Sequence, residues 1–191
     1  DVILGSAEVQ APTEKIRRPR VELPYVRVGD HARFQALMAR AANGVALTVA
    51  IAHPCDEISI AAAAEAAQAG LITPILVGPM AKIAAAAVAA NVDISGYRLV
   101  DIPDSAAAAA EAVALVKRGE AVLLMKGSLH TDELLHAVLL PDSGLRTGRL
   151  LSHVYLMDVP AYPRPLLVTD GAVNIAPDLA QKRDIVQNAI D

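Results

Sequence analysis

The residues best suited to chemistry concentrate in one stretch, residues 125–154, which reads MKGSLHTDELLHAVLLPDSGLRTGRLLSHV. Its first loop places an ammonium group, a glycine, two hydroxyls and an imidazole between Lys126 and Thr131, just before an expected helix. Free backbone amides at a helix start attract anions. The loop therefore predicts phosphate binding. The alternative is that Lys126 is a solvated cation at a strand end and that Thr131 only caps the helix.

A second group of cations follows in the same stretch. Arg146 and Arg149 are three residues apart, with Thr147 and Gly148 between them and Ser152 shortly after. A turn or a helix start with this spacing can direct both guanidinium groups at one anion. We predict an anion site here, with a solvated polar surface as the alternative.

Two further loops carry polar groups. Cys55 lies close to a helix start, where the pKa of a thiol can fall, so it can serve as a nucleophile. We favour a turn role for Cys55, and a loop or core role for the neighbouring His53. Asp170 and Asn174 can hold a hydroxyl, an amide or a metal, although a turn role is again favoured.

These loops are separated by a regular alternation of apolar strands and helices. Near-continuous apolar strands separated by helices of this kind indicate βαβ units and a mainly parallel sheet covered on both faces, a three-layer αβα arrangement. In such folds ligands bind beyond the carboxyl ends of the strands, where the loops fall. Strands are predicted over 46–53, 71–77, 97–102 and 121–125, and helices over 31–42 (capped by Asp30), 57–68, 80–90, 104–118 and 131–140.

The last fifty residues depart from this alternation. Apolar segments 151–159 and 166–169 are joined by a proline-containing turn too short for a crossover helix, which predicts an antiparallel hairpin. A helix begins at about residues 177–178. We predict a first α/β domain over 25–140 and the start of a second, incomplete α/β domain over 141–191. Residues 1–24, rich in proline and cations, predict a linker, or alternatively an arm that wraps a partner subunit.

Composition excludes several classes of protein. Hydrophobic residues make up 54% of the chain and charged residues 20%, which is typical of a globular protein. The net charge of -4 argues against nucleic-acid binding, and no apolar run is long enough to span a membrane. A single cysteine fits a reducing compartment, so we expect a cytoplasmic protein. The GxxxxGK[ST], GxGxxG, HExxH, GxSxG and CxxC motifs are all absent.

Four segments together resemble the phosphate acetyltransferase and phosphate butyryltransferase family. They are HPCDEISIAAAAEAAQAGLITPILVGP from His53, MKGSLHT from Met125, GLRTGRLLSHVYLMDVP from Gly144, and LLVTDGAVNIAPDLAQKRDIVQNAI from Leu166. The resemblance runs from about Leu37 to the end of the chain. It implies reversible transfer of an acetyl or butyryl group between coenzyme A and inorganic phosphate, with coenzyme A as a substrate and no metal or tightly bound cofactor.

The resemblance also implies an isocitrate/isopropylmalate dehydrogenase-like fold, an active site in a cleft between two domains, and a homodimer or larger homo-oligomer. Phosphate would be bound by the arginines, and the oxyanion by a backbone amide of the lysine loop. The implied catalytic residues are Lys126, His130, Arg146 and Arg149. The implied substrate-binding residues are Gly127, Thr131, Thr147, Gly148, Ser152, Asp170 and Asn174.

The chain departs from the family pattern in two respects. Acetyl-specific members of the family have an arginine at the position where this chain has Ala137. The segment GLRTGR is more similar to butyryl-type members, so the acyl preference stays open. Sequences of the family also continue well beyond the position of Asp191. The alternative to an acyltransferase is therefore a non-catalytic coenzyme A- or phosphate-binding module, or an inactive fragment of such an enzyme. A dehydrogenase-related enzyme sharing the fold is a third possibility. Residues 1–23 resemble the linker after a MaoC-like hydratase domain in fused hydratase–transacylase proteins.

Overall fold

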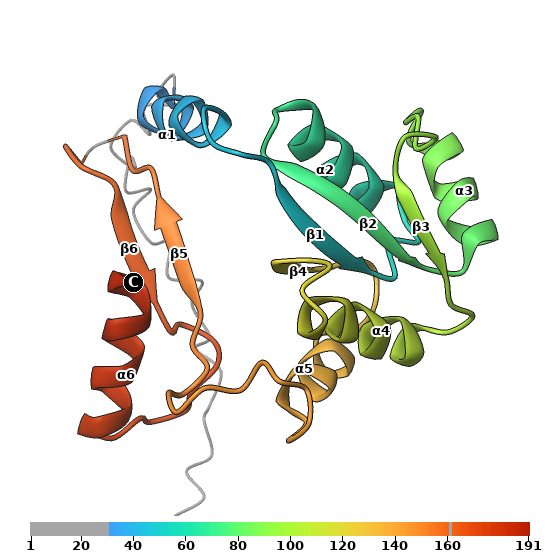
Figure 1. The fold of residues 1–191 in the computed structure, drawn as a ribbon. Coiled ribbons are helices and arrows are strands. Elements are labelled where there is room, and N and C mark those ends of the chain that lie inside the picture. Colours follow the sequence, from blue (N-terminus) through green and yellow to red (C-terminus); the bar gives the residue numbers. More distant parts are fainter. Residues whose placement is uncertain (1–30, 161) are drawn as a thin grey trace, which may run out of the picture.

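The computed structural model describes residues 31–160 and 162–191 (Figure 1). The predicted linker or arm, its resemblance to a MaoC-linked segment, and the predicted cap Asp30 lie outside the described residues. The elements are α1 (Ala32–Ala42), β1 (Leu47–Ala52), α2 (Glu57–Gln68), β2 (Ile72–Gly78), α3 (Met80–Ala89), β3 (Arg98–Asp101), α4 (Ser105–Lys117), β4 (Leu123–Lys126), α5 (Thr131–Leu139), β5 (Val154–Met157), β6 (Leu166–Thr169) and α6 (Leu179–Ile190).

Strands β1 to β4 form one parallel sheet in the order β3-β2-β1-β4. Successive side chains of a strand point to opposite faces, so the apolar strand β1 serves two cores. Ala50 and Ala52 pack in a cluster that includes residues of α4 and α5, whereas Val49 and Ile51 pack with residues of α2 and α3. The prediction of a mainly parallel sheet covered on both faces is confirmed.

Acidic side chains fix the starts of three helices. Asp56 accepts a hydrogen bond from the Ser59 backbone N–H at 2.8 Å, and Asp104 does the same for Ala107 at 2.8 Å. Asp178 begins α6 in the same way. Each of these bonds satisfies an amide that has no partner within its helix.

Helix α5 begins at the predicted residue, Thr131, but its capping residue is a different one. Thr131 is not the capping residue, because it is already the first helical residue and His130 occupies the cap position. The reason is Glu133, whose Oε2 accepts from the backbone N–H of His130 at 3.0 Å. A carboxylate at this position is a known way to close a helix start.

Strands β5 and β6 form the predicted antiparallel hairpin, with Val154 opposite Thr169 and Met157 opposite Leu166. The first strand is shorter than the predicted 151–159. Figure 1 shows α6 alongside this hairpin, apart from the four-stranded sheet. Much of the hairpin is uncovered, with Tyr155 58% exposed and Leu167 55% exposed.

Helix α1 contacts the hairpin, although it precedes the parallel sheet in sequence. The Arg33 guanidinium donates to Asp158 Oδ1 at 3.1 Å, and the backbone N–H of Phe34 donates to Asp158 Oδ2 at 3.3 Å. This contact links residues on both sides of the boundary predicted at 140–141, and the boundary itself stays a prediction. None of the helices in the described residues is long and apolar enough to cross a membrane.

The ends of β1 and β4 approach each other too closely for a side chain. The backbone N–H of Gly127 donates to the Ala52 carbonyl at 2.9 Å. A Cβ on Gly127 would lie 2.5 Å from the Ala52 oxygen and 2.6 Å from the His53 oxygen. Both contacts are to backbone atoms, which cannot rotate aside, so only glycine fits here.

We therefore expect Gly127→Ala to lower the free energy of unfolding by about 1–3 kcal/mol, as overpacking of a core does. Urea denaturation followed by circular dichroism measures this. Gly96→Ala is the matched control, because nothing lies within 4 Å of a Cβ at that position, and it should change stability by less than about 0.5 kcal/mol. Equal stabilities of the two variants would contradict the steric argument.

Candidate functional site

The loops after β1 and β4 meet at the carboxyl edge of the sheet. Ser128 Oγ donates to the His53 carbonyl at 2.8 Å and accepts from the backbone N–H of Cys55 at 3.2 Å. The same hydroxyl lies 3.2 Å from His53 Nδ1. The structure therefore joins the first and second predicted loops, and Ser128 is the residue that connects them.

Lys126 closes its own loop. Its Nζ donates to the Leu129 carbonyl at 2.9 Å and to the Gly127 carbonyl at 3.2 Å. The ammonium group thus holds Gly127 in place rather than extending freely into solvent. A phosphate at this loop would have to compete with these two carbonyls for the same charge.

His130 and Thr131 lie exposed where α5 begins. Behind them, Glu133 accepts from Ser105 Oγ at 2.8 Å in addition to the His130 amide, which ties α5 to α4. The four predicted residues of this loop, Lys126, Gly127, His130 and Thr131, are therefore grouped at one edge of the sheet.

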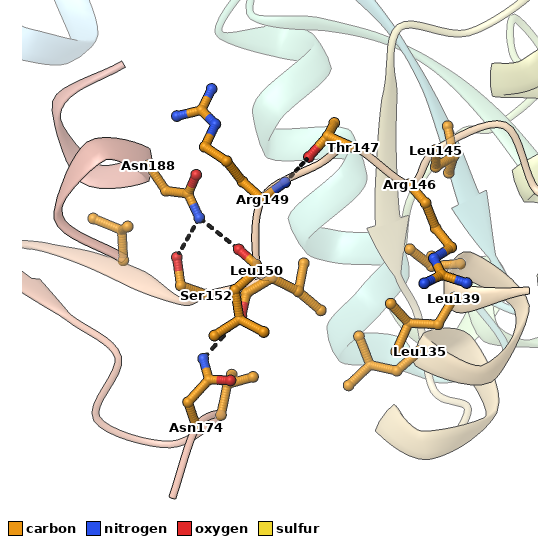
Figure 2. Close-up of a pocket in the computed structure, with 14 residues that line it drawn as sticks. Leu135, Leu139, Leu145, Arg146, Thr147, Arg149, Leu150, Ser152, Asn174 and Asn188 are labelled. Carbon is orange, nitrogen blue, oxygen red and sulfur yellow. Dashed lines mark hydrogen bonds between the residues drawn. The ribbon is translucent and has the colours of Figure 1, made fainter. Parts of the chain in front are cut away.

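Most of the remaining predicted residues line a separate pocket, of about 580 Å³, formed by α5, residues 145–154, α6 and the loop after β6 (Figure 2). One wall is apolar and includes leucines of α5. The predicted residues that line the pocket are Arg146, Thr147, Arg149, Ser152 and Asn174, whereas Gly148, Asp170 and the Lys126 loop do not line it.

The two arginines of this pocket do not converge. Figure 2 shows Arg146 beside Leu135 and Leu139 of α5, whereas the side chain of Arg149 points away from this helix. The Arg149 guanidinium pairs with Asp191 Oδ2 at 2.6 Å, and this bond holds the pKa of the Asp191 carboxyl below its usual range. The predicted arrangement of both guanidinium groups around one anion is thus not present in this structure. The reason is that Arg149 already has a carboxylate partner.

Asparagines fix the backbone of the pocket. Asn188 Nδ2 donates to the Leu150 carbonyl and to Ser152 Oγ, both at 2.8 Å, and Asn174 Nδ2 donates to the Leu151 carbonyl at 2.9 Å. Asp170 accepts from the Asn174 backbone N–H at 3.2 Å, which is the turn role that the sequence favoured for this pair. Sequence spacing did not single out Asn188, because nothing marks one polar residue of a mixed helix as inward-facing.

Comparisons with known proteins agree with this arrangement of elements. The family model described as phosphate acetyl/butaryl transferase matches residues 105–191. A phosphate acetyltransferase of Rhizobium meliloti is 55% identical over 84% of this chain and 51% of its own length. A phosphate butyryltransferase of Clostridium beijerinckii is 39% identical over 82% of this chain and 52% of its own length.

The chain belongs to the phosphate acetyl/butyryl transferase family. A crystal structure of a branched-chain phosphotransacylase from Enterococcus faecalis is 31% identical to it, with a TM-score of 0.59 over 75% of this chain and 49% of the other. The chain spans about half the length of the curated relatives it matches, 51% of the first and 52% of the second described above.

Two further residues of this family member are informative. Burial raises the pKa of the Cys55 thiol, which makes a thiolate nucleophile less available and supports a turn role. His153 follows Ser152 and packs edge-on against Tyr155, with ring centroids 4.0 Å apart. Neither ring nitrogen of His153 has a hydrogen-bond partner among the described residues. A buried polar ring without a partner carries a desolvation cost.

The internal bonds of Lys126 give a testable prediction. Lys126→Met removes two charge-assisted bonds, so we expect faster hydrogen exchange at amides 127–130 and a loss of about 1 kcal/mol in the free energy of unfolding. Lys182→Met makes the same chemical change on exposed α6, where the lysine has no ion pair within the described part. This control should change neither the hydrogen exchange of amides 127–130 nor the free energy of unfolding. Unchanged exchange in the Lys126 variant would show that the bonds do not order the loop.

Proposed function

We propose that this chain supplies part of the active site of an acyltransferase that moves an acetyl or butyryl group between coenzyme A and inorganic phosphate. The observation that carries the proposal is the pocket that gathers Arg146, Thr147, Arg149, Ser152 and Asn174 in a member of this family. Cationic and polar groups on one side, with leucines on the other, suit a substrate that joins an anion to an apolar acyl chain.

The chemistry follows from the groups that the site provides. Phosphate is already nucleophilic at neutral pH, so catalysis depends mainly on binding its charge and orienting it toward the thioester carbon. Arg146 forms no salt bridge within the described residues, whereas Arg149 is paired with Asp191, so Arg146 is the cation of the pocket best placed for this role. Backbone amides at the start of α5 would stabilise the oxyanion of the tetrahedral intermediate.

We further propose the isocitrate/isopropylmalate dehydrogenase-like fold for the whole protein, with the cleft between its two domains as the active site. The chemical step would need no metal and no tightly bound cofactor, since coenzyme A is itself a substrate. Assembly as a homodimer or larger homo-oligomer, with no nucleic-acid or membrane partner, and a cytoplasmic location complete the proposal. The relatives' names include both acetyl and butyryl transferases, so acyl preference is left to measurement.

Release of coenzyme A from acetyl-CoA and butyryl-CoA in the presence of phosphate, with the longest natural form of the protein, tests this assignment. Arg146→Ala should lower kcat/KM by about 10²-fold or more, the usual cost of losing one group that stabilises transition-state charge. Arg149→Ala should lower it as well. Arg183→Ala, on the exposed face of α6, is the control. Activity unchanged in both pocket variants would refute the site.

A non-catalytic coenzyme A- or phosphate-binding module is the second candidate. It is favoured by the internal pairing of Arg149 with Asp191 and of Lys126 with its own loop. This function predicts that calorimetry detects binding of coenzyme A or phosphate, while the longest natural form releases no coenzyme A from either thioester.

A further inference from the structure

Two asparagines hold the pocket segment that contains Ser152. Residues 150–153 belong to no helix or strand, so side chains must fix their path. Asn188 of α6 donates through Nδ2 to the Leu150 carbonyl at 2.8 Å, and Asn174, in the loop after β6, donates to the Leu151 carbonyl at 2.9 Å (Figure 2). The residues that make these bonds all line the pocket that also contains Arg146.

The Leu150 carbonyl determines which way the amide of Asn188 faces. A backbone carbonyl can only accept a hydrogen bond, so the atom of Asn188 that faces it must be the NH₂ nitrogen and not the amide oxygen. The same nitrogen lies 2.8 Å from Ser152 Oγ. Because an amide NH₂ group donates and does not accept, Ser152 Oγ is the acceptor in this second bond.

The hydroxyl proton of Ser152 therefore stays available for another partner. A serine hydroxyl has one proton to donate, and none of it is used in the bond from Asn188. Within residues 31–160 and 162–191, this bond is the only one that Ser152 Oγ makes. Ser152 is half-buried and lines the pocket, so the group that takes its proton would be a ligand of the pocket with an accepting oxygen.

We propose that Asn188 is a positioning residue, which holds the Ser152 hydroxyl as a hydrogen-bond donor to phosphate in this pocket. The inference rests on the proposed function and adds a neutral donor to the cation Arg146. The unprotonated oxygens of phosphate only accept, and a donor to a charged oxygen forms one of the stronger hydrogen bonds in proteins. Without the Asn188 amide the hydroxyl could rotate freely, and part of this bond would be lost to its ordering.

Kinetics of coenzyme A release measure what the hydroxyl contributes. The assay uses the longest natural form of the protein, with phosphate varied at saturating acyl-CoA. Ser152→Ala should raise the KM for phosphate by about tenfold or more, the usual value of a hydrogen bond to a charged group. The KM for acyl-CoA should stay unchanged. A general loosening of the fold would not separate the two KM values in this way.

A double-mutant cycle tests whether Asn188 acts through Ser152. Asn188→Leu removes the amide at nearly the same side-chain size, and it should raise the KM for phosphate by about threefold or more. In the Ser152→Ala background the same change should add less than about twofold, because the hydroxyl that it orients is already gone. An equal factor in both backgrounds would show a purely structural role and overturn the positioning role. Asn188→Ala repeats the comparison with a smaller side chain.

Asn43→Leu is the matched control, because it makes the same change at the exposed end of α1, outside the pocket. It should keep the wild-type KM for phosphate. Urea denaturation of every variant shows whether a loss of folding contributes to its kinetics.

Calorimetric titration with inorganic phosphate separates this inference from the proposed function. If the wild type releases no coenzyme A but Ser152→Ala binds phosphate more weakly, the proposed acyl transfer is refuted and the inference stands. If coenzyme A is released and Ser152→Ala leaves both the affinity and the KM for phosphate unchanged, the inference is refuted and the proposed function stands. A wild type that binds no phosphate would refute both.

Discussion

The contact between the ends of β1 and β4 is the constraint on which most of the described structure depends. Gly127 lies against the carbonyls of Ala52 and His53, and the bonds that it and Ser128 make to them hold the two strand ends together. Three consequences follow from this one approach. It fixes the start of α5, it brings Ser128 to His53, and it turns the lysine loop back on itself. The chemistry of the sheet edge is thus a product of backbone packing.

The cations of the two predicted sites are largely engaged within the protein. Lys126 donates to two carbonyls and Arg149 pairs with a carboxylate. When an anion binds at either place, the cation must give up its present partners. The free energy gained on binding is therefore smaller than the new contacts alone suggest. Exposed ion pairs such as Arg149–Asp191 contribute little to stability, and releasing one costs correspondingly little.

The sequence predicted the elements well, because their signals are local. Apolar runs over β1 and β2 indicated strands buried on both faces, and the short proline turn excluded a crossover between β5 and β6. Contacts between distant segments could not be predicted in this way. The pairing of β1 with β4 depends on strand order, which one sequence does not reveal, and the contact of Ser128 with His53 depends on that pairing. The same limit explains why the separation of Arg146 from Arg149 was missed, since the spacing of two residues does not reveal their other partners.

The position of α1 has a mechanical consequence. Because Arg33 and Phe34 hold α1 to Asp158, the chain passes between the hairpin and the parallel sheet twice, once through residues 43–46 and once through residues 140–153. Two bodies joined by a single tether can tumble independently, whereas two bodies joined at two points can only pivot about the line between those points. The second of these connections includes Arg146 and Arg149. Any pivoting of the hairpin would therefore change the width of the pocket while leaving the edge of the sheet, with His53 and Ser128, unchanged.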